Sequence, residues 1–167
     1  HIYYMTVSGH MYYSFSGNSM SSRNKDAVKH LDMSENARAY YACHIELDKA
    51  LQYLIEQLEK EIVGCKLNGH RTKRLPGNVN MSLSGMEGET VLIRLDMQGI
   101  CASTGSACTS GSLEPSHVLL AMGLDTSTAK SSIRFSLSEE NTYDEADVLV
   151  TCLKEIVVSL RETLDLG

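Results

Sequence analysis

Hydrophobic residues recur at helical spacing in one long stretch near the middle of the chain. The stripe consists of Leu47, Leu51, Leu54, Leu58 and Ile62. Charged and polar residues, among them Asp48, Lys49 and Glu56, fill the opposite face, which is typical of an amphipathic helix that packs one face on a core. Asp32 and Glu35 have the spacing of a capping box, so we expect this helix to begin there and to run to Val63, with Gly64 just beyond its end.

A second helical stripe closes the chain. It consists of Leu149, Leu153, Ile156, Leu160 and Leu164. Thr142 and Glu145, just before it, form another capping box, so a helix is expected from this point to the C-terminal end. Cys152 flanks the stripe and is interpreted as a packed core residue.

Two shorter stretches between these helices alternate strictly between apolar and polar residues. The apolar sets are Val79, Met81 and Leu83 in the first stretch, and Ile133, Phe135 and Leu137 in the second. A period of two predicts half-buried strands. Because Arg134 lies between two apolar residues of the second strand, it is expected to project from the face opposite the core.

The remaining segments predict short elements. Residues 87–97 have the pattern of a helix that ends before Gly99, and residues 100–102 that of a brief strand. A helix over 115–122, with Pro115 in its first turn, would end at Gly123, and 125–130 would form one more turn. Residues 66–70 contain Asn-Gly and predict a tight turn.

Short strands separated by helices predict an α+β domain. The expected architecture is a small β-sheet covered on one face by helices, with long helices at both ends. Its uncovered face would hold Arg134. Residues 1–33 lack a clear period and carry Ser, Gly and Asn in clusters, so we divide the chain into an N-terminal arm (1–33) and a domain (34–167).

A run of small, uncharged residues over 103–112 contains one thiol, Cys108. Such a run buries too little apolar surface to offset its ordering entropy, so a mobile loop is expected. A thiol on a loop held at both ends suits chemistry in which sulfur must move. A surface linker with an incidental cysteine is the alternative.

Composition excludes several classes of function. The net charge of −6 gives no electrostatic footprint for nucleic acid. Because no run of eighteen apolar residues occurs, no membrane span is expected. The five cysteines have no regular spacing, which favours reduced thiols in a cytoplasmic protein without a metal site.

Arg134 is a candidate binding residue on the second predicted strand. A guanidinium held on a strand, with Ser132 and Ser136 as its polar neighbours, has the planar donor geometry that binds a carboxylate. A solvated surface arginine is the alternative.

Several motifs together resemble the C-terminal, small domain of the cysteine desulfurases, which are pyridoxal-phosphate enzymes related to class V aminotransferases. The resemblance covers roughly residues 45 to 162. The motifs are EGE (87–89), GSACTSGSLEPSHVL (105–119), AMGL (121–124) and SIRFSL (132–137), with LNGH (67–70) and RLPGNVN (74–80) before them. The fold implied is the small domain of fold-type I pyridoxal-phosphate enzymes.

The resemblance implies a catalytic role for Cys108 and a substrate-binding role for Arg134. In the family a loop thiolate takes the sulfur of L-cysteine as a persulfide, releases alanine, and passes the sulfur to an acceptor protein. Cys108 matches that thiol, and Arg134 matches the residue that binds the substrate α-carboxylate. The acceptor, and whether the sulfur serves iron–sulfur cluster assembly, tRNA thiolation or another use, stays open.

The family's Schiff-base lysine, pyridine acid and phosphate cradle belong to a large domain that has no match here. We therefore expect pyridoxal phosphate in the complete enzyme but not bound to this chain alone. Alternatives are a free-standing persulfide-relay or docking domain and a redox module that pairs Cys101 with Cys108. An uncovered polar face favours association, so a homodimer is expected.

Overall fold

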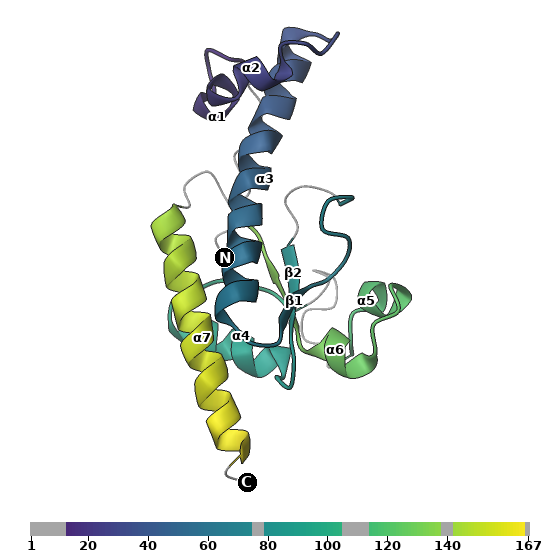
Figure 1. The fold of residues 1–167 in the computed structure, drawn as a ribbon, viewed down its shortest axis with the longest axis vertical. Coiled ribbons are helices and arrows are strands. Elements are labelled where there is room, and N and C mark those ends of the chain that lie inside the picture. The colour runs from purple at the N-terminus through teal and green to yellow at the C-terminus, as the bar shows by residue number, and fades with distance from the viewer. Residues whose placement is uncertain (1–12, 75–78, 105–113, 138–141, 166–167) are drawn as a thin grey trace.

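The sheet of this protein is small and antiparallel. The computed structural model describes residues 13–74, 79–104, 114–137 and 142–165. Within these residues three strands, β1 (Cys65–Leu67), β2 (Val79–Leu83) and β3 (Ser132–Phe135), form one sheet in the order β1-β2-β3. Helices pack around it (Figure 1). The α+β class predicted from the sequence is confirmed.

Strand β1 was not predicted from the sequence, where residues 66–70 indicated a tight turn that overlaps it. A three-residue strand is too short to show alternation. The chain turns back at Gly64, whose φ of 77° is readily adopted by glycine, and Cys65 then pairs with Leu83 of β2. Tertiary pairing, which the local pattern does not encode, therefore makes this strand.

The prediction of a brief strand at residues 100–102 is wrong. Ile100 donates its backbone N–H to the carbonyl of Leu95, so it closes the turn that follows helix α4 (Gly88–Met97). Contact with the sheet begins only after the predicted strand, at Ser103, which forms an isolated bridge with Arg134. The helix itself was predicted correctly, and Gly99 follows it with a φ of 77°.

The long central helix α3 runs over Glu35–Glu61. Its cap is Ser34, whose hydroxyl accepts a hydrogen bond from the Ala37 N–H at 3.3 Å, so the start predicted at Asp32 is wrong. The helix ends two residues before Val63, with Ile62 as its C-cap. All five residues of the predicted stripe are buried.

The last helix, α7 (Tyr143–Asp165), has the predicted capping box: the Glu145 carboxylate accepts from the Thr142 N–H, and the Thr142 hydroxyl accepts from the Glu145 N–H. It lies beside α3 and runs in the same direction (Figure 1). Leu164 is 64% exposed, contrary to the predicted stripe, because the last turn extends past the core.

The hydrophobic core lies between one face of the sheet and helices α3, α4 and α7. Leu58 of α3, Met81 and Ile133 of the sheet, Leu95 of α4 and Leu153 of α7 are fully buried members of one cluster. The helices expected to cover a face of the sheet therefore do so by closing this core.

Two short helices, α5 (His117–Ala121) and α6 (Thr126–Lys130), connect to β3. Pro115 precedes the N-cap Ser116, so its predicted place in the first turn of the helix is wrong. Gly123 follows α5 with a φ of 89°, and the predicted turn over 125–130 is α6. Helix α6 packs against β2.

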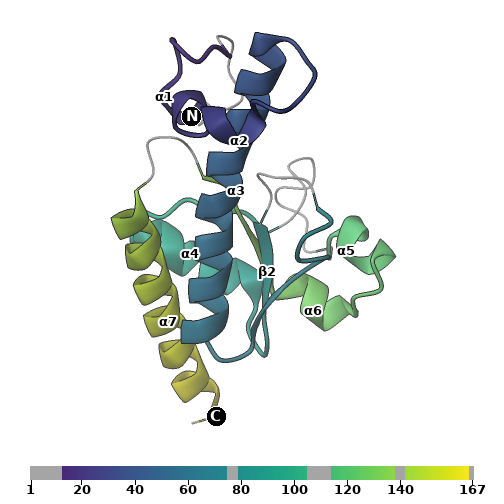
Figure 2. The same cartoon turned by 45° about the horizontal axis from the view of Figure 1, so that its top comes forward.

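The N-terminal part of the described chain forms two further short helices, α1 (Ser19–Arg23) and α2 (Lys25–Val28). Both pack on the first half of α3, at the end that extends away from the sheet (Figures 1 and 2). Among the residues that the structure describes, no helix is long and apolar enough to cross a membrane.

Candidate functional site

The face of the sheet that turns away from the core is polar. Along β2, Asn80 and Ser82 alternate with the core residues, and along β3 Ser132 and Arg134 do the same. Cross-strand pairing aligns Asn80 with Arg134, and Ser82 with both Ser132 and Lys66. We define this surface as the polar face, formed by Lys66, Asn68, Asn80, Ser82, Ser132 and Arg134.

The polar face has a covered end and an open end. Ser82 and Ser132 are buried where α6 packs on the sheet. Asn80 and Arg134, one step further along the strands, are half-buried. A ligand could therefore reach the Asn80–Arg134 end of the face, while the opposite end is closed by protein.

Arg134 lies on this face, as the alternation in the sequence predicted. Its backbone pairs with Ser103, which donates to the Arg134 carbonyl at 3.2 Å and accepts from the Arg134 N–H at 2.6 Å. Within the described residues its guanidinium has no hydrogen-bond or ion-pair partner. A half-buried cation with open donors is suited to binding an anion.

Asn68 connects the open end to the covered end. Its Nδ2 donates to Asn80 Oδ1 at 2.7 Å and to Ser132 Oγ at 3.0 Å, and the Ser132 hydroxyl donates to the Thr128 carbonyl at 2.8 Å. Neither Asn68 nor Asn80 was predicted from the sequence as a site residue. The alternation at Asn80 was the available signal, since it placed this residue on the same side of the sheet as Arg134.

Cys108 lies outside the described residues. The structure describes the chain up to Thr104, and Thr104 lies close to Gly88, where a Cβ would be 3.4 Å from its Cγ2. Together with the bridge between Ser103 and Arg134, this contact fixes the first two residues of the small-residue run at the edge of the polar face. Glu114, shortly before α5, is the next residue that the structure describes.

The described thiols have different environments. Cys43 and Cys65 are buried, Cys152 is half-buried, and Cys101 is exposed. Burial, with a smaller contribution from Glu59, raises the pKa of Cys65 to about 12. Cys65 is therefore a protonated structural thiol at neutral pH. Among the described residues, no group of three His, Cys, Asp or Glu side chains is arranged to hold a metal ion.

Whether this chain can attach pyridoxal phosphate covalently depends on the surroundings of its lysines. The cofactor needs an amine that forms a Schiff base within a water-excluding pocket. All eight lysines of the sequence lie in the described residues, and every one is exposed: Lys25, Lys29, Lys49, Lys60, Lys66, Lys73, Lys130 and Lys154. The residues present here therefore do not fit the covalent attachment of the cofactor.

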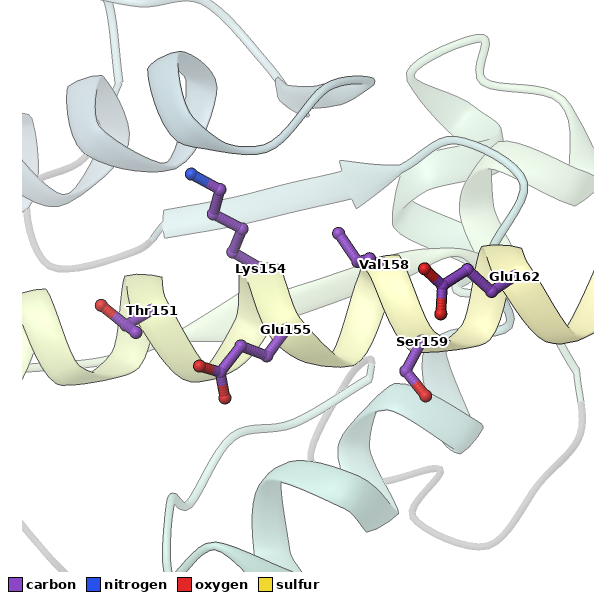
Figure 3. A pocket seen from close by; sticks show the side chains of 6 residues that line it. All are labelled: Thr151, Lys154, Glu155, Val158, Ser159 and Glu162. Carbon is purple, nitrogen blue, oxygen red and sulfur yellow. The ribbon is translucent and has the colours of Figure 1, made fainter.

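A shallow depression of about 550 Å³ lies on the outer surface of α7 (Figure 3). Its lining comes from one helix and consists of Thr151, Lys154, Glu155, Val158, Ser159 and Glu162. Two of these side chains tie α7 to its neighbours, because Lys154 pairs with Glu61 of α3 and Ser159 accepts from Arg94 of α4. The depression therefore belongs to the helix packing and does not include the polar face.

Comparison with known proteins identifies the family. The family model described as aminotransferase class V matches residues 10–149. The chain belongs to the class V aminotransferase family. Members of this family depend on pyridoxal phosphate. The match begins before α1, so it includes most of the segment that the sequence resemblance left out.

Among class V relatives, cysteine desulfurases match closely. A cysteine desulfurase IscS of Clostridium botulinum is 50% identical over 111 residues, which cover 65% of this chain and 28% of the relative. A cysteine desulfurase of a Nostoc species is 48% identical over 118 residues, 70% of this chain and 30% of the relative. The chain thus spans less than a third of the length of these relatives.

Solved structures agree with this assignment. A NifS-like protein from Rickettsia africae aligns with a TM-score of 0.58 and 27% identity, over 72% of this chain and 32% of that protein. Another NifS-like protein aligns with a TM-score of 0.57 and 25% identity, over 74% of this chain and 33% of that protein. The class V chain therefore shares its fold with a part of these larger proteins.

Proposed function

We propose that this chain is the small domain of a cysteine desulfurase, residues 34–167 with an N-terminal arm, and that it supplies Cys108 as nucleophile and Arg134 as carboxylate-binding residue. The observation that carries the proposal is the open guanidinium of Arg134 on the polar face, backbone-paired with Ser103 at the start of the segment that contains Cys108. The similarity to cysteine desulfurases also supports this proposal.

The short chain between Ser103 and Cys108 supports a joint role. Cys108 is the fifth residue after Ser103, and a chain spans at most about 3.6 Å per residue. Covalent geometry therefore keeps the Cα atoms of these two residues within about 18 Å. A thiol tethered at this length can approach a ligand held by Arg134 and can also turn toward an acceptor.

In the proposed reaction the Cys108 thiolate attacks the sulfur of L-cysteine. An S–S bond forms, the bond between the sulfur and Cβ of the substrate breaks, and Cβ keeps the electron pair and takes a proton to give alanine. The proton lost by Cys108 balances the one gained by carbon. The persulfide then transfers its outer sulfur to a thiol of an acceptor protein.

Pyridoxal phosphate supplies the electron sink for breaking the carbon–sulfur bond when it is bound in the complete enzyme. Because the lysines of this chain are all exposed, we place its attachment site in protein outside this chain. This chain's part is to bind the carboxylate and to carry the sulfur.

A chimera tests the proposal. The segment of the Clostridium botulinum relative that matches this chain is replaced by the corresponding residues of this chain, and alanine production from L-cysteine is measured. We expect activity that Cys108→Ser abolishes and that the matched control Cys101→Ser retains. Arg134→Gln should raise KM about tenfold or more, since a charge-assisted bond is lost. An unchanged rate for Cys108→Ser contradicts the proposal.

The second candidate is a persulfide relay without catalysis of its own, favoured by the exposure of every lysine. Incubating the chain with an active cysteine desulfurase and L-cysteine, then mapping added sulfur by mass spectrometry, distinguishes the two. Relay function predicts added sulfur on Cys108 and none on Cys101. Absence of transfer to Cys108 rules the relay out.

The proposed homodimer has support in exposed apolar side chains. Ile93 and Met97 of α4 and Val118 of α5 are at least half exposed. Such side chains favour association between copies. Sedimentation velocity over a range of concentrations tests this directly, and a monomer throughout contradicts it.

A further inference from the structure

The hydrogen bonds around Asn68 have a fixed direction. The Thr128 carbonyl can only accept, so the Ser132 hydroxyl must donate its proton to it. Ser132 Oγ then accepts from the amide nitrogen of Asn68. The second hydrogen of that nitrogen goes to Asn80, which must present its oxygen. The orientation of both amides therefore follows from one backbone carbonyl.

This direction leaves the amide nitrogen of Asn80 as an open donor. Because Oδ1 is turned toward Asn68, Nδ2 points away from it, and it has no partner in the part of the chain that the structure describes. Asn80 is half-buried, so water satisfies this donor less completely than at an exposed site. A ligand acceptor would complete its hydrogen bonds.

Asn80 and Arg134 are direct cross-strand partners on the polar face. Residues directly opposite in an antiparallel pair have Cβ atoms about 5 Å apart. The side chains of Asn80 and Arg134 therefore leave the sheet next to each other on the polar face. Both present donors, and the described residues place no anion between them.

We infer that Asn80 is a second donor to the carboxylate bound by Arg134, and that Asn68 is a positioning residue that orients it. The inference rests on the proposed function, in which Arg134 binds the carboxylate of the amino-acid substrate. Asn80 adds an uncharged hydrogen-bond donor beside the guanidinium of Arg134. The two donors together select a carboxylate by its shape as well as by its charge.

The test uses the full chain labelled with ¹⁵N and two probes, L-alanine and L-alaninamide, which differ in the carboxylate. Side-chain signals of Asn80 and Arg134 are followed during each titration. We expect both signals to shift with L-alanine, and L-alaninamide to bind more weakly. The backbone amide signals of β2 and β3 report whether each variant keeps the fold.

Substitutions distinguish the role of Asn80 from that of Asn68. Asn80→Ala should weaken L-alanine binding about tenfold, as expected for one bond to a charged group. Asn80→Asp keeps an oxygen for Asn68 but replaces the donor by a negative charge, so it should weaken binding further. Asn68→Ala should weaken binding while leaving the Arg134 shift. Asn36→Asp, at an exposed position of α3, is the matched control and should have no effect.

The outcomes also separate this inference from the proposed function. If Arg134→Gln abolishes binding and both Asn80 variants bind as the wild type, the role of Asn80 is overturned and that of Arg134 stands. If the wild type does not distinguish L-alanine from L-alaninamide, or Arg134→Gln binds normally, the carboxylate role of Arg134 fails and the inference fails with it.

Discussion

Individual thiols of this chain differ in reactivity because they differ in burial. Cys65 is 5% exposed at the start of β1, and its pKa is raised to about 12. Cys101 is exposed beyond the end of α4. Burial therefore makes Cys65 an unreactive, structural thiol.

Alkylation tests this difference. At pH 8 a thiol with a pKa of about 12 is thiolate in about one molecule in ten thousand, so iodoacetamide should label Cys101 rapidly and Cys65 only after unfolding. Since the raised pKa favours the neutral thiol, its contribution to stability is complete below pH 9.0 and declines as the pH rises toward 12. Peptide mapping that finds equal labelling of both residues would contradict the prediction.

The position of helix α4 depends on a close approach between its first residue and the backbone of the segment before β3. A Cβ at Gly88 would lie 2.6 Å from the Lys130 carbonyl oxygen and 3.2 Å from that of Ser132. Gly88 therefore allows the helix to begin against the segment that leads into β3. Moving that segment would move Arg134, two residues after Ser132.

Gly88→Ala should destabilise the fold by about 2–3 kcal/mol, because a rigid backbone must move to admit the methyl group. Gly99→Ala is the matched control: its φ is 77° and nothing lies within 4 Å of its Cβ position. Only the strain of a left-handed residue applies there, about 1 kcal/mol. Urea unfolding curves of both variants measure the difference, and equal midpoints would show that the close approach has no cost.

Helices and strands were predictable where local signals were strong. The box formed by Thr142 and Glu145 marks the start of α7, and alternation marks β2. The start of α3 was misplaced because Asp32 and Ser34 both suit a cap, and only the backbone conformation selects Ser34. Strand β1 depends on a distant partner, which no local pattern shows.

The molecule as a whole divides at the middle of α3. The main hydrophobic cluster includes no residue before Leu47. The earlier buried apolar residues, Val28, Ala39, Ala42 and Cys43, lie where α1 and α2 pack on the first half of α3. The boundary predicted between residues 33 and 34 lies before this division, which falls inside α3, and stays a prediction.

Deleting residues 1–33 should therefore leave the sheet folded. Hydrogen exchange is the measurement: amides of Met81 and Ile133 should keep the protection seen in the full chain, while those of α3 before Leu47 should exchange faster because their covering helices are gone. Loss of protection at Met81 and Ile133 would show that the N-terminal segment is part of the same cooperative unit.

The sequence by itself determined the helix stripes, the two longer strands and the side of the sheet on which Arg134 lies, because each depends on spacing between near neighbours. The tertiary structure decided which residues join Arg134. Asn68, Asn80 and Ser103 come from three separate segments, and only the pairing of strands and the bridge to β3 align them in one row. Long-range hydrogen bonds of this kind leave no local pattern, so the composition of the candidate site required the fold.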